Sequence, residues 1–138
     1  MTLHYTLNIE DHLAWYDTHD ELFRCGPAAI PVIGWLLRWE ARSKFKSALK
    51  LPASSAGFGE RSIEITDRGI REFNERFDFF VPWCEIAVAV TSKSRLFLAR
   101  PCMNAFVVPL AACDTTNRRV ELFNLLEINT KLRESHCA

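Results

Sequence analysis

The sequence lacks a net charge, a paired cysteine motif and a long hydrophobic run. Its 138 residues carry 17 basic and 17 acidic side chains, which argues against the nucleic-acid binding that a basic excess supports. The five cysteines form no CxxC pair and match no zinc template. We therefore expect reduced thiols, no bound metal and a cytoplasmic location, with Cys84 and Cys113 as small core residues.

The most apolar run, CGPAAIPVIGWLL at 25–37, is too short to cross a membrane as a helix. Thirteen residues reach about 20 Å along a helix, whereas the hydrocarbon core is about 30 Å thick. The run also holds two prolines and two glycines, which are unfavourable in a helix interior. We interpret it as a turn of helix that the core or a partner covers. The segment MTLHYTLN contains no basic stretch followed by an apolar one, so we expect no signal peptide.

Motifs that carry chemistry are also missing from the sequence. It contains no HExxH, GxSxG, kinase or Gly-rich phosphate-loop pattern. His12 and His19 lie two helical turns apart, about 10 Å along the axis, which is too far for one shared metal ion. We expect a protein that is not an enzyme and has no catalytic residue, metal or cofactor. A cysteine-dependent activity around Cys84 or Cys102 is the third function considered.

The N-terminal third predicts one strand and two helices. Residues 3–8 alternate as in a strand, and Asn8 has the side chain of a cap for a helix that runs to about Phe23. A second helix is expected from Trp35 to Leu51. Its predicted apolar face consists of Leu37, Ala41, Phe45 and Ala48, beside a basic stripe of Arg38, Arg42, Lys46 and Lys50.

After the loop-like segment 52–60 the pattern changes to short strands. Strands are predicted at 61–65, near 70–73 or 76–81, at 83–91, at 95–99 and at 105–110, with Glu72 and Glu75 at the surface. A final amphipathic helix, capped by Asp114, Thr115 or Thr116, is expected to run to about Glu134. A strand meander closed by one helix is the layout of a pleckstrin-homology-like (PH-like) domain.

The predicted fold is therefore α+β and forms a single domain over 1–138. An N-terminal strand and helical segment (1–51) is followed by the loop 52–60. Residues 61–138 then form an antiparallel PH-like sheet, a partly open barrel, with a C-terminal amphipathic helix.

The order of these elements resembles that of the YcxB-like family of bacterial proteins. The similarity lies in YTLNIEDHLAW at 5–15 and in the apolar patterns RSIEITDRGI, FVPWCEIAVAV and LFLARPCMNAFVVPLAAC within 61–113. The resemblance implies a strand and a Glu-Asp helix, then a transmembrane region and basic residues, then a PH-like domain, with no established catalytic residues. In this chain the region that corresponds to the family's transmembrane segment is shortened to 25–37. This shortening implies a soluble protein with the same order of elements.

Charge and aromatic content indicate a binding surface in the first 51 residues. Residues 1–34 hold five acidic side chains against one basic side chain, and residues 35–51 hold five basic side chains against Glu40 alone. Segregated charge steers association, and Trp and Tyr are enriched at binding hot spots. The predicted partner-binding residues are Trp15, Tyr16, His19, Trp35, Trp39, Arg38, Arg42, Lys46 and Lys50.

Two functions account for this surface. The leading hypothesis is a soluble protein-binding module, such as an inhibitor or immunity-type protein that neutralises a toxin or another enzyme. The alternative is a peripheral membrane protein that binds anionic lipid through residues 25–50. A solvated helix face and ordinary core packing would explain the same residues without either function.

Overall fold

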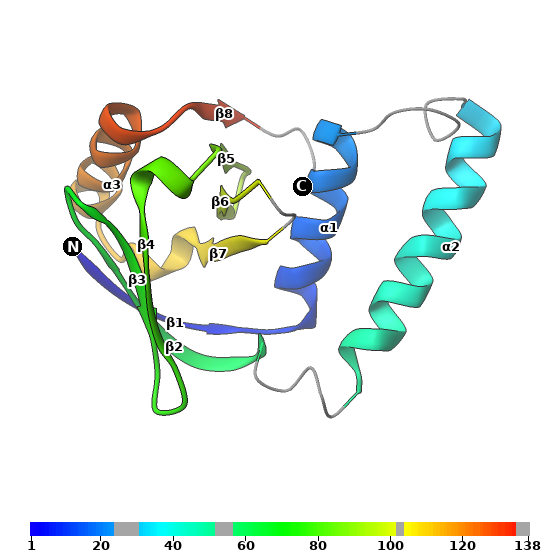
Figure 1. Cartoon of the computed structure of the whole chain (residues 1–138), viewed down its shortest axis with the longest axis horizontal. Coiled ribbons are helices and arrows are strands. Elements are labelled where there is room, and N and C mark those ends of the chain that lie inside the picture. Colours follow the sequence, from blue (N-terminus) through cyan, green and yellow to red (C-terminus); the bar gives the residue numbers. More distant parts are fainter. Residues whose placement is uncertain (24–30, 52–56, 102–103, 135–138) are drawn as a thin grey trace.

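The computed structural model describes residues 1–23, 31–51, 57–101 and 104–134. They form the predicted α+β fold, in which an N-terminal strand and two helices precede antiparallel sheets and a C-terminal helix (Figure 1). The helices are α1 (Ile9–Phe23), α2 (Pro31–Leu49) and α3 (Thr116–Asn129), with short 3-10 turns η3 (Trp83–Glu85) and η4 (Leu110–Ala112). The strands are β1 (Thr2–Leu7), β2 (Gly59–Ile65), β3 (Gly69–Phe73), β4 (Asp78–Pro82), β5 (Val88–Thr91), β6 (Arg95–Ala99), β7 (Ala105–Pro109) and β8 (Leu132–Glu134).

The strands form two four-stranded sheets, ordered β1-β2-β3-β4 and β7-β6-β5-β8. Every pair is antiparallel except β5 with β8, which is parallel. Side chains of both sheets and of α3 fill a main core, in which Ile63, Leu98 and Leu122 are fully buried. A second core around Phe97 and Trp15 joins α1 to the other face of the β5–β7 sheet. In the described part of the chain, the strands do not close into a barrel.

Helices α1 and α2 are inserted between β1 and β2, two strands that pair directly. β1 ends where Leu7 pairs with Gly59, the first residue of β2. α1 lies against the sheets, and α2 runs antiparallel to α1 on its far side (Figure 1). The topology therefore places α2 at the periphery of the molecule, with α1 between α2 and the sheets.

The caps that the sequence predicts are confirmed. The backbone N–H of Asp11 donates to Oδ1 of Asn8 at 3.2 Å, and the backbone N–H of Asn8 donates to Oδ2 of Asp11 at 2.9 Å. This reciprocal arrangement is a capping box, and it fixes the start of α1 directly after β1. At α3, Oγ1 of Thr115 accepts from the backbone N–H of Arg118 at 3.3 Å.

Three predicted boundaries are wrong. α2 begins at Pro31 and not at Trp35, because proline is well suited to the first helical position. In 83–91 the strand starts only at Val88, since the preceding 3-10 turn buries Trp83, whose Nε1 donates to the carbonyl of Thr66 at 2.8 Å. The last helix ends at Asn129, because the following residues pair with β5 as strand β8.

Two side chains are also placed differently from their predictions. Cys84 is exposed on the 3-10 turn whose inward residue is Trp83, whereas Cys113 is buried as predicted. Glu72 is buried and not at the surface, because it shares the inner face of β3 with Ile70, while Glu75 is exposed as predicted. The segment 25–30 and Cys102 lie outside the described residues.

Candidate functional site: the outer face of the second helix

Helix α2 contacts α1 through one side only. The ring of Phe45 stacks on that of Tyr16, with centroids 4.9 Å apart. Arg42 forms a bidentate pair with Asp17, in which Nε lies 2.9 Å from Oδ1 and Nη2 lies 3.2 Å from Oδ2. Gly34 is buried as well. The predicted apolar face is therefore partly wrong, because Leu37, Ala41 and Ala48 are exposed.

Ion pairs neutralise part of the positive charge of α2. The hydrogen bonds to Asp17 raise the pKa of Arg42, and Asp17 neutralises this member of the stripe. Lys44 lies 2.6 Å from Glu40 one turn earlier, and this hydrogen bond lowers the pKa of Glu40. Within the described part of the chain, Lys46 and Lys50 form no ion pair and are exposed. The remaining positive charge is therefore concentrated in the C-terminal half of α2.

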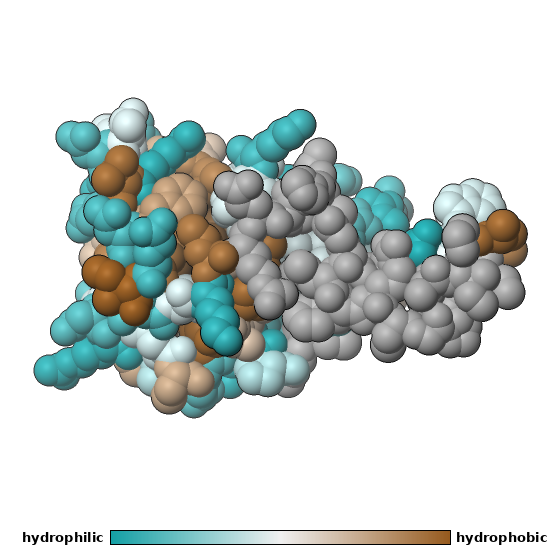
Figure 2. Space-filling model, turned by 90° about the horizontal axis from the view of Figure 1, so that it is seen from above, coloured by the Kyte–Doolittle hydropathy of each residue, from teal (hydrophilic) through white to brown (hydrophobic). Residues whose placement is uncertain are grey.

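The opposite side of α2 carries an apolar row that faces solvent, which we call the outer row. It consists of Val32, Trp35, Leu36 and Trp39, whose exposed fractions are 72%, 60%, 52% and 65%. Their i, i+3, i+4, i+7 spacing places them within about 100° of the helix circumference over about 10 Å. Seen from above, hydrophobic and near-neutral residues gather at the outer edge of α2 (Figure 2). A cluster of this kind marks an interaction surface more often than a single exposed side chain does.

The structure divides the predicted partner-binding residues between three places. Trp15 is buried against Phe97, with His19 beside it, and so belongs to the core beneath α1. Tyr16 and Arg42 join the two helices, and Arg38 is half-buried on the same side of α2. The exposed outer side of α2 carries Trp35, Trp39, Lys46 and Lys50.

Sequence reasoning missed Val32 and Leu36 as members of this surface. Both belong to the apolar run at 25–37, which was interpreted as covered by the core or by a partner. Their spacing from Trp35 and Trp39 predicts that the four residues share one face, because positions i, i+3, i+4 and i+7 lie on one side of a helix. The sequence could not show that this face points away from α1.

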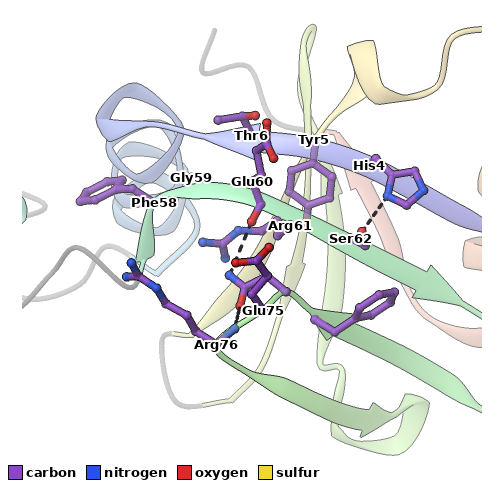
Figure 3. Close-up of a pocket in the computed structure, with 12 residues that line it drawn as sticks. His4, Tyr5, Thr6, Phe58, Gly59, Glu60, Arg61, Ser62, Glu75 and Arg76 are labelled. Atoms are coloured by element: carbon purple, nitrogen blue, oxygen red, sulfur yellow. Dashed lines mark hydrogen bonds between the residues drawn. The ribbon is translucent and has the colours of Figure 1, made fainter.

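A second candidate site is an open groove at one end of the β1–β4 sheet (Figure 3). Its volume is about 1010 Å³, and its charged lining residues are Glu60, Arg61, Glu75 and Arg76. Nδ1 of His4 lies 2.6 Å from Oγ of Ser62, its direct partner across β1 and β2. This pair is exposed on a sheet face, where polar cross-strand pairs are ordinary. We interpret it as a cross-strand contact and not as a nucleophile with its base.

Tyr5 and Arg61, which line this groove, form a polar cluster with the buried Glu72. Oη of Tyr5 donates to Oε1 of Glu72 at 2.9 Å, and Nη1 of Arg61 lies 3.3 Å from the same oxygen. The side chains of Arg61 and Glu72 are each 6% exposed, and the Arg61 guanidinium lies 5.5 Å from the ring centroid of Phe77. Burial is the main cause that raises the pKa of Tyr5, and the charge of Glu72 adds to it.

The raised pKa of Tyr5 makes stability depend on alkaline pH. Between the ordinary tyrosine pKa of about 10 and the higher folded value, the folded chain keeps a proton that the unfolded chain has lost. The Tyr5 contribution is therefore complete below about pH 10 and declines above it by up to about 1.4 kcal/mol per pH unit. Urea unfolding between about pH 8 and 11 should show a shallower decline for Tyr5→Phe. Tyr16→Phe, at the other tyrosine, should keep the parental slope, and equal slopes in all three proteins would contradict the prediction.

The described histidines and thiols do not form a metal site. Nε2 of His12 donates to the backbone oxygen of Gly57 at 2.7 Å, and its ring contacts Phe58 edge-on, while His19 contacts Trp15. Because a backbone oxygen can only accept, Nε2 of His12 carries the proton in this contact. Among the described residues, no group of three His, Cys, Asp or Glu side chains is arranged to hold a metal ion.

The large exposed apolar side chains of α2 lie in its first half. None of the helices in the described ranges has the length and hydropathy that a membrane crossing requires. The arrangement thus leaves an exposed apolar surface on a peripheral helix. Comparisons with family models, with curated proteins and with solved structures found no match to this chain.

Proposed function

We propose that this protein is a non-enzymatic binding module that docks another protein through the outer row of α2. The observation that carries the proposal is the exposure of Val32, Trp35, Leu36 and Trp39 along one side of a helix. An apolar row with this spacing is the form in which a helix enters a groove on its partner. The expected partner therefore has an apolar groove about two helical turns long.

Charge indicates what borders that groove. Lys46 and Lys50 lie on the same side of α2 as the outer row, about two turns further along the helix. A groove with carboxylates at one end complements them and accelerates association. A partner of this chemistry, such as a toxin or enzyme whose site the helix blocks, fits the surface.

A membrane fits the same surface less well. An interfacial helix needs an apolar face along its whole length, with basic residues on both flanks. In α2 the outer side of the C-terminal half carries Ser43, Lys46 and Lys50, and Arg42 is turned towards Asp17. Only half of the helix could therefore enter a lipid surface.

We also propose that the body of the molecule is PH-like and that the resemblance to the YcxB-like family reflects common descent. Support comes from the element order, in which the β1–β4 sheet, the strands β5–β7 and α3 follow one another. In this proposal the α1–α2 insertion supplies the binding helix α2, and the sheets hold the insertion in place.

The proposal predicts that the two tryptophans carry most of the affinity. Proteins captured from the cells that make this chain should be identified, purified and titrated by calorimetry against the parent chain and two variants. Trp35→Ser combined with Trp39→Ser should weaken binding by about 30-fold or more, since one hot-spot side chain contributes about 2 kcal/mol. Leu37→Ser is the matched control, because Leu37 is 44% exposed on the same helix but outside the outer row.

Two results would contradict this proposal. The first is a purified partner that binds the double tryptophan variant as tightly as the parent. The second is flotation with vesicles of phosphatidylcholine and phosphatidylserine that is lost in the double variant and retained in Leu37→Ser. The second result would assign the outer row to a membrane and not to a protein.

A further inference from the structure

Strand β4 forms a free edge of the β1–β4 sheet. It pairs with β3 on one side, and among the described strands none pairs with its other side. In an antiparallel pair, the backbone groups of successive residues point alternately towards and away from the neighbouring strand. The backbone N–H of Asn74 donates to the carbonyl of Phe77 at 2.9 Å, so Phe77 and Phe79 are bonded to β3. The N–H and C=O groups of Asp78 and Phe80 therefore point towards the free edge.

This edge lacks the features that keep a further strand from pairing. A lysine, a proline or a bulge in the middle of an edge strand blocks such pairing. In β4 the proline is the last residue, and the aromatic side chains of Phe79 and Phe80 are 41% and 52% exposed. In the described part of the chain, the outward backbone groups of Asp78 and Phe80 have no hydrogen-bond partner. Another extended backbone is the group that satisfies all of them at once.

The inner side of the edge offers an apolar contact. Phe79 shares the inner face of β4 with Val81 and stacks on Phe106 of β7, with ring centroids 5.5 Å apart. The exposure of Phe79 shows that the core is open along β4, where the two sheets do not close into a barrel. A strand added at this edge would place one side chain directly beside Phe79, in a non-hydrogen-bonded pair where side chains are closest. An apolar side chain at that position would cover the ring.

The outer side of the edge favours a basic side chain. Nη2 of Arg71 lies 2.6 Å from Oδ2 of Asp78, and Nη1 of the same arginine lies 3.6 Å from Oε2 of Glu64. Two carboxylates thus share one guanidinium, which leaves a net negative charge on this side. A residue of the added strand opposite Asp78 points to the same face, where a lysine or arginine would balance the charge. An aromatic residue opposite Phe80 would cover that exposed ring.

We propose that β4 binds an extended segment of a partner protein, which adds a strand to the β1–β4 sheet. The segment runs antiparallel to β4, the orientation with the more stable pairing, and each of Phe80 and Asp78 exchanges a pair of backbone hydrogen bonds with it. It carries an aromatic, an apolar and a basic residue, in this order, opposite Phe80, Phe79 and Asp78. β4 lies on the other side of α1 from α2, so the inference does not depend on the proposed function of the outer row (Figure 1).

The first test is a peptide with this pattern, acetyl-Thr-Thr-Phe-Val-Lys-Thr-Thr-amide. Titration of the full chain, followed by amide NMR shifts, should give a dissociation constant of about 1 mM or below. The matched control peptide is methylated at the backbone nitrogens of its Phe and Lys, which removes the donors to the carbonyls of Phe80 and Asp78. It should bind about tenfold or more weakly, because each lost hydrogen bond reduces the affinity. Equal binding of the two peptides, or no binding of the first, would overturn the inference.

Amide hydrogen exchange locates the added strand. In the free chain the amide of Phe80 should exchange rapidly, whereas the amides of Phe79 and Val81 should be protected by β3. Saturation with the first peptide should slow exchange at Phe80 and Asp78 by about tenfold or more and leave the other two amides unchanged. If the free chain forms a dimer in which Phe80 is already protected, β4 of a second copy occupies the edge, and the proposed occupant is wrong.

A proline substitution tests the same edge from the side of the protein. Phe80→Pro removes the outward N–H without removing a hydrogen bond to β3, a position at which edge strands tolerate proline. Phe80→Ala is the matched control, because it also loses the ring but keeps the N–H. Phe80→Pro should bind the first peptide about fivefold or more weakly than Phe80→Ala does, and equal affinities would contradict the inference. Should Phe80→Pro fail to fold, the methylated peptide decides the question, because it leaves the protein unchanged.

Discussion

Glu72→Ala should destabilise the protein by about 3–5 kcal/mol, measured as the free energy of unfolding in urea. The substitution leaves the Arg61 guanidinium, whose side chain is 6% exposed, without the carboxylate that lies 3.3 Å away. It also removes the acceptor of the Tyr5 hydroxyl. A buried charge without its counter-charge is far more costly than an exposed one, because water cannot replace the lost partner.

Two further variants show whether the loss of stability comes from breaking the buried ion pair or from removing a glutamate at any position. Glu75→Ala changes an exposed carboxylate in the turn between β3 and β4 and should alter stability by no more than about 0.5 kcal/mol. Arg61→Met combined with Glu72→Leu removes both charges and should recover much of the stability, since apolar residues can replace a buried pair. A loss below about 1 kcal/mol for Glu72→Ala would show that the pair is hydrated and that the inner face of the sheet is not dry.

The sequence predicts the local elements because their signals are local. Asn8 and Asp11 are three residues apart and form their cap without help from the rest of the fold. Thr115 marks the start of α3 in the same way. The late start of β5 had no such signal, because it depends on Trp83 reaching the distant carbonyl of Thr66.

The burial of Glu72 could be predicted in part from the sequence pattern. Strand residues two apart share a face, so Ile70 in the core places Glu72 on the inner side of β3. The general rule that carboxylates lie at the surface overrode this pattern in the prediction. What makes the exception stable is Arg61, which lies on the neighbouring strand and cannot be assigned as its partner before the register is known.

The candidate site shows the same division between pattern and tertiary contact. The apolar spacing of the outer row is present in the sequence, and Trp35 and Trp39 were predicted as binding residues. The side of α2 that meets α1 is decided by Phe45 with Tyr16 and by Arg42 with Asp17. Those contacts link residues far apart in sequence, so the outer row could be identified as exposed only in the folded chain.

Phe97→Ala should destabilise the protein by about 3–5 kcal/mol, because it empties a fully buried site. Phe97 packs against Trp15, with ring centroids 5.4 Å apart, in the core that holds α1 on the β5–β7 sheet. Phe80→Ala is the matched control, since Phe80 is 52% exposed on the edge strand β4, and it should cost about 1 kcal/mol or less. Urea unfolding followed by circular dichroism measures both.

This substitution also tests how α2 is held in place, because α1 is the element that connects α2 to the sheets. If Phe97 holds α1 on the sheet, Phe97→Ala should weaken the binding of a partner to the outer row. This effect is expected in the absence of urea, where the chain remains folded. The reason is that a loosened α1 no longer fixes the orientation of α2, and a mobile docking helix loses entropy when it binds. A Phe97→Ala protein with parental stability would mean that α1 is not packed on the β5–β7 sheet. The outer row would then have no fixed position from which to meet a partner.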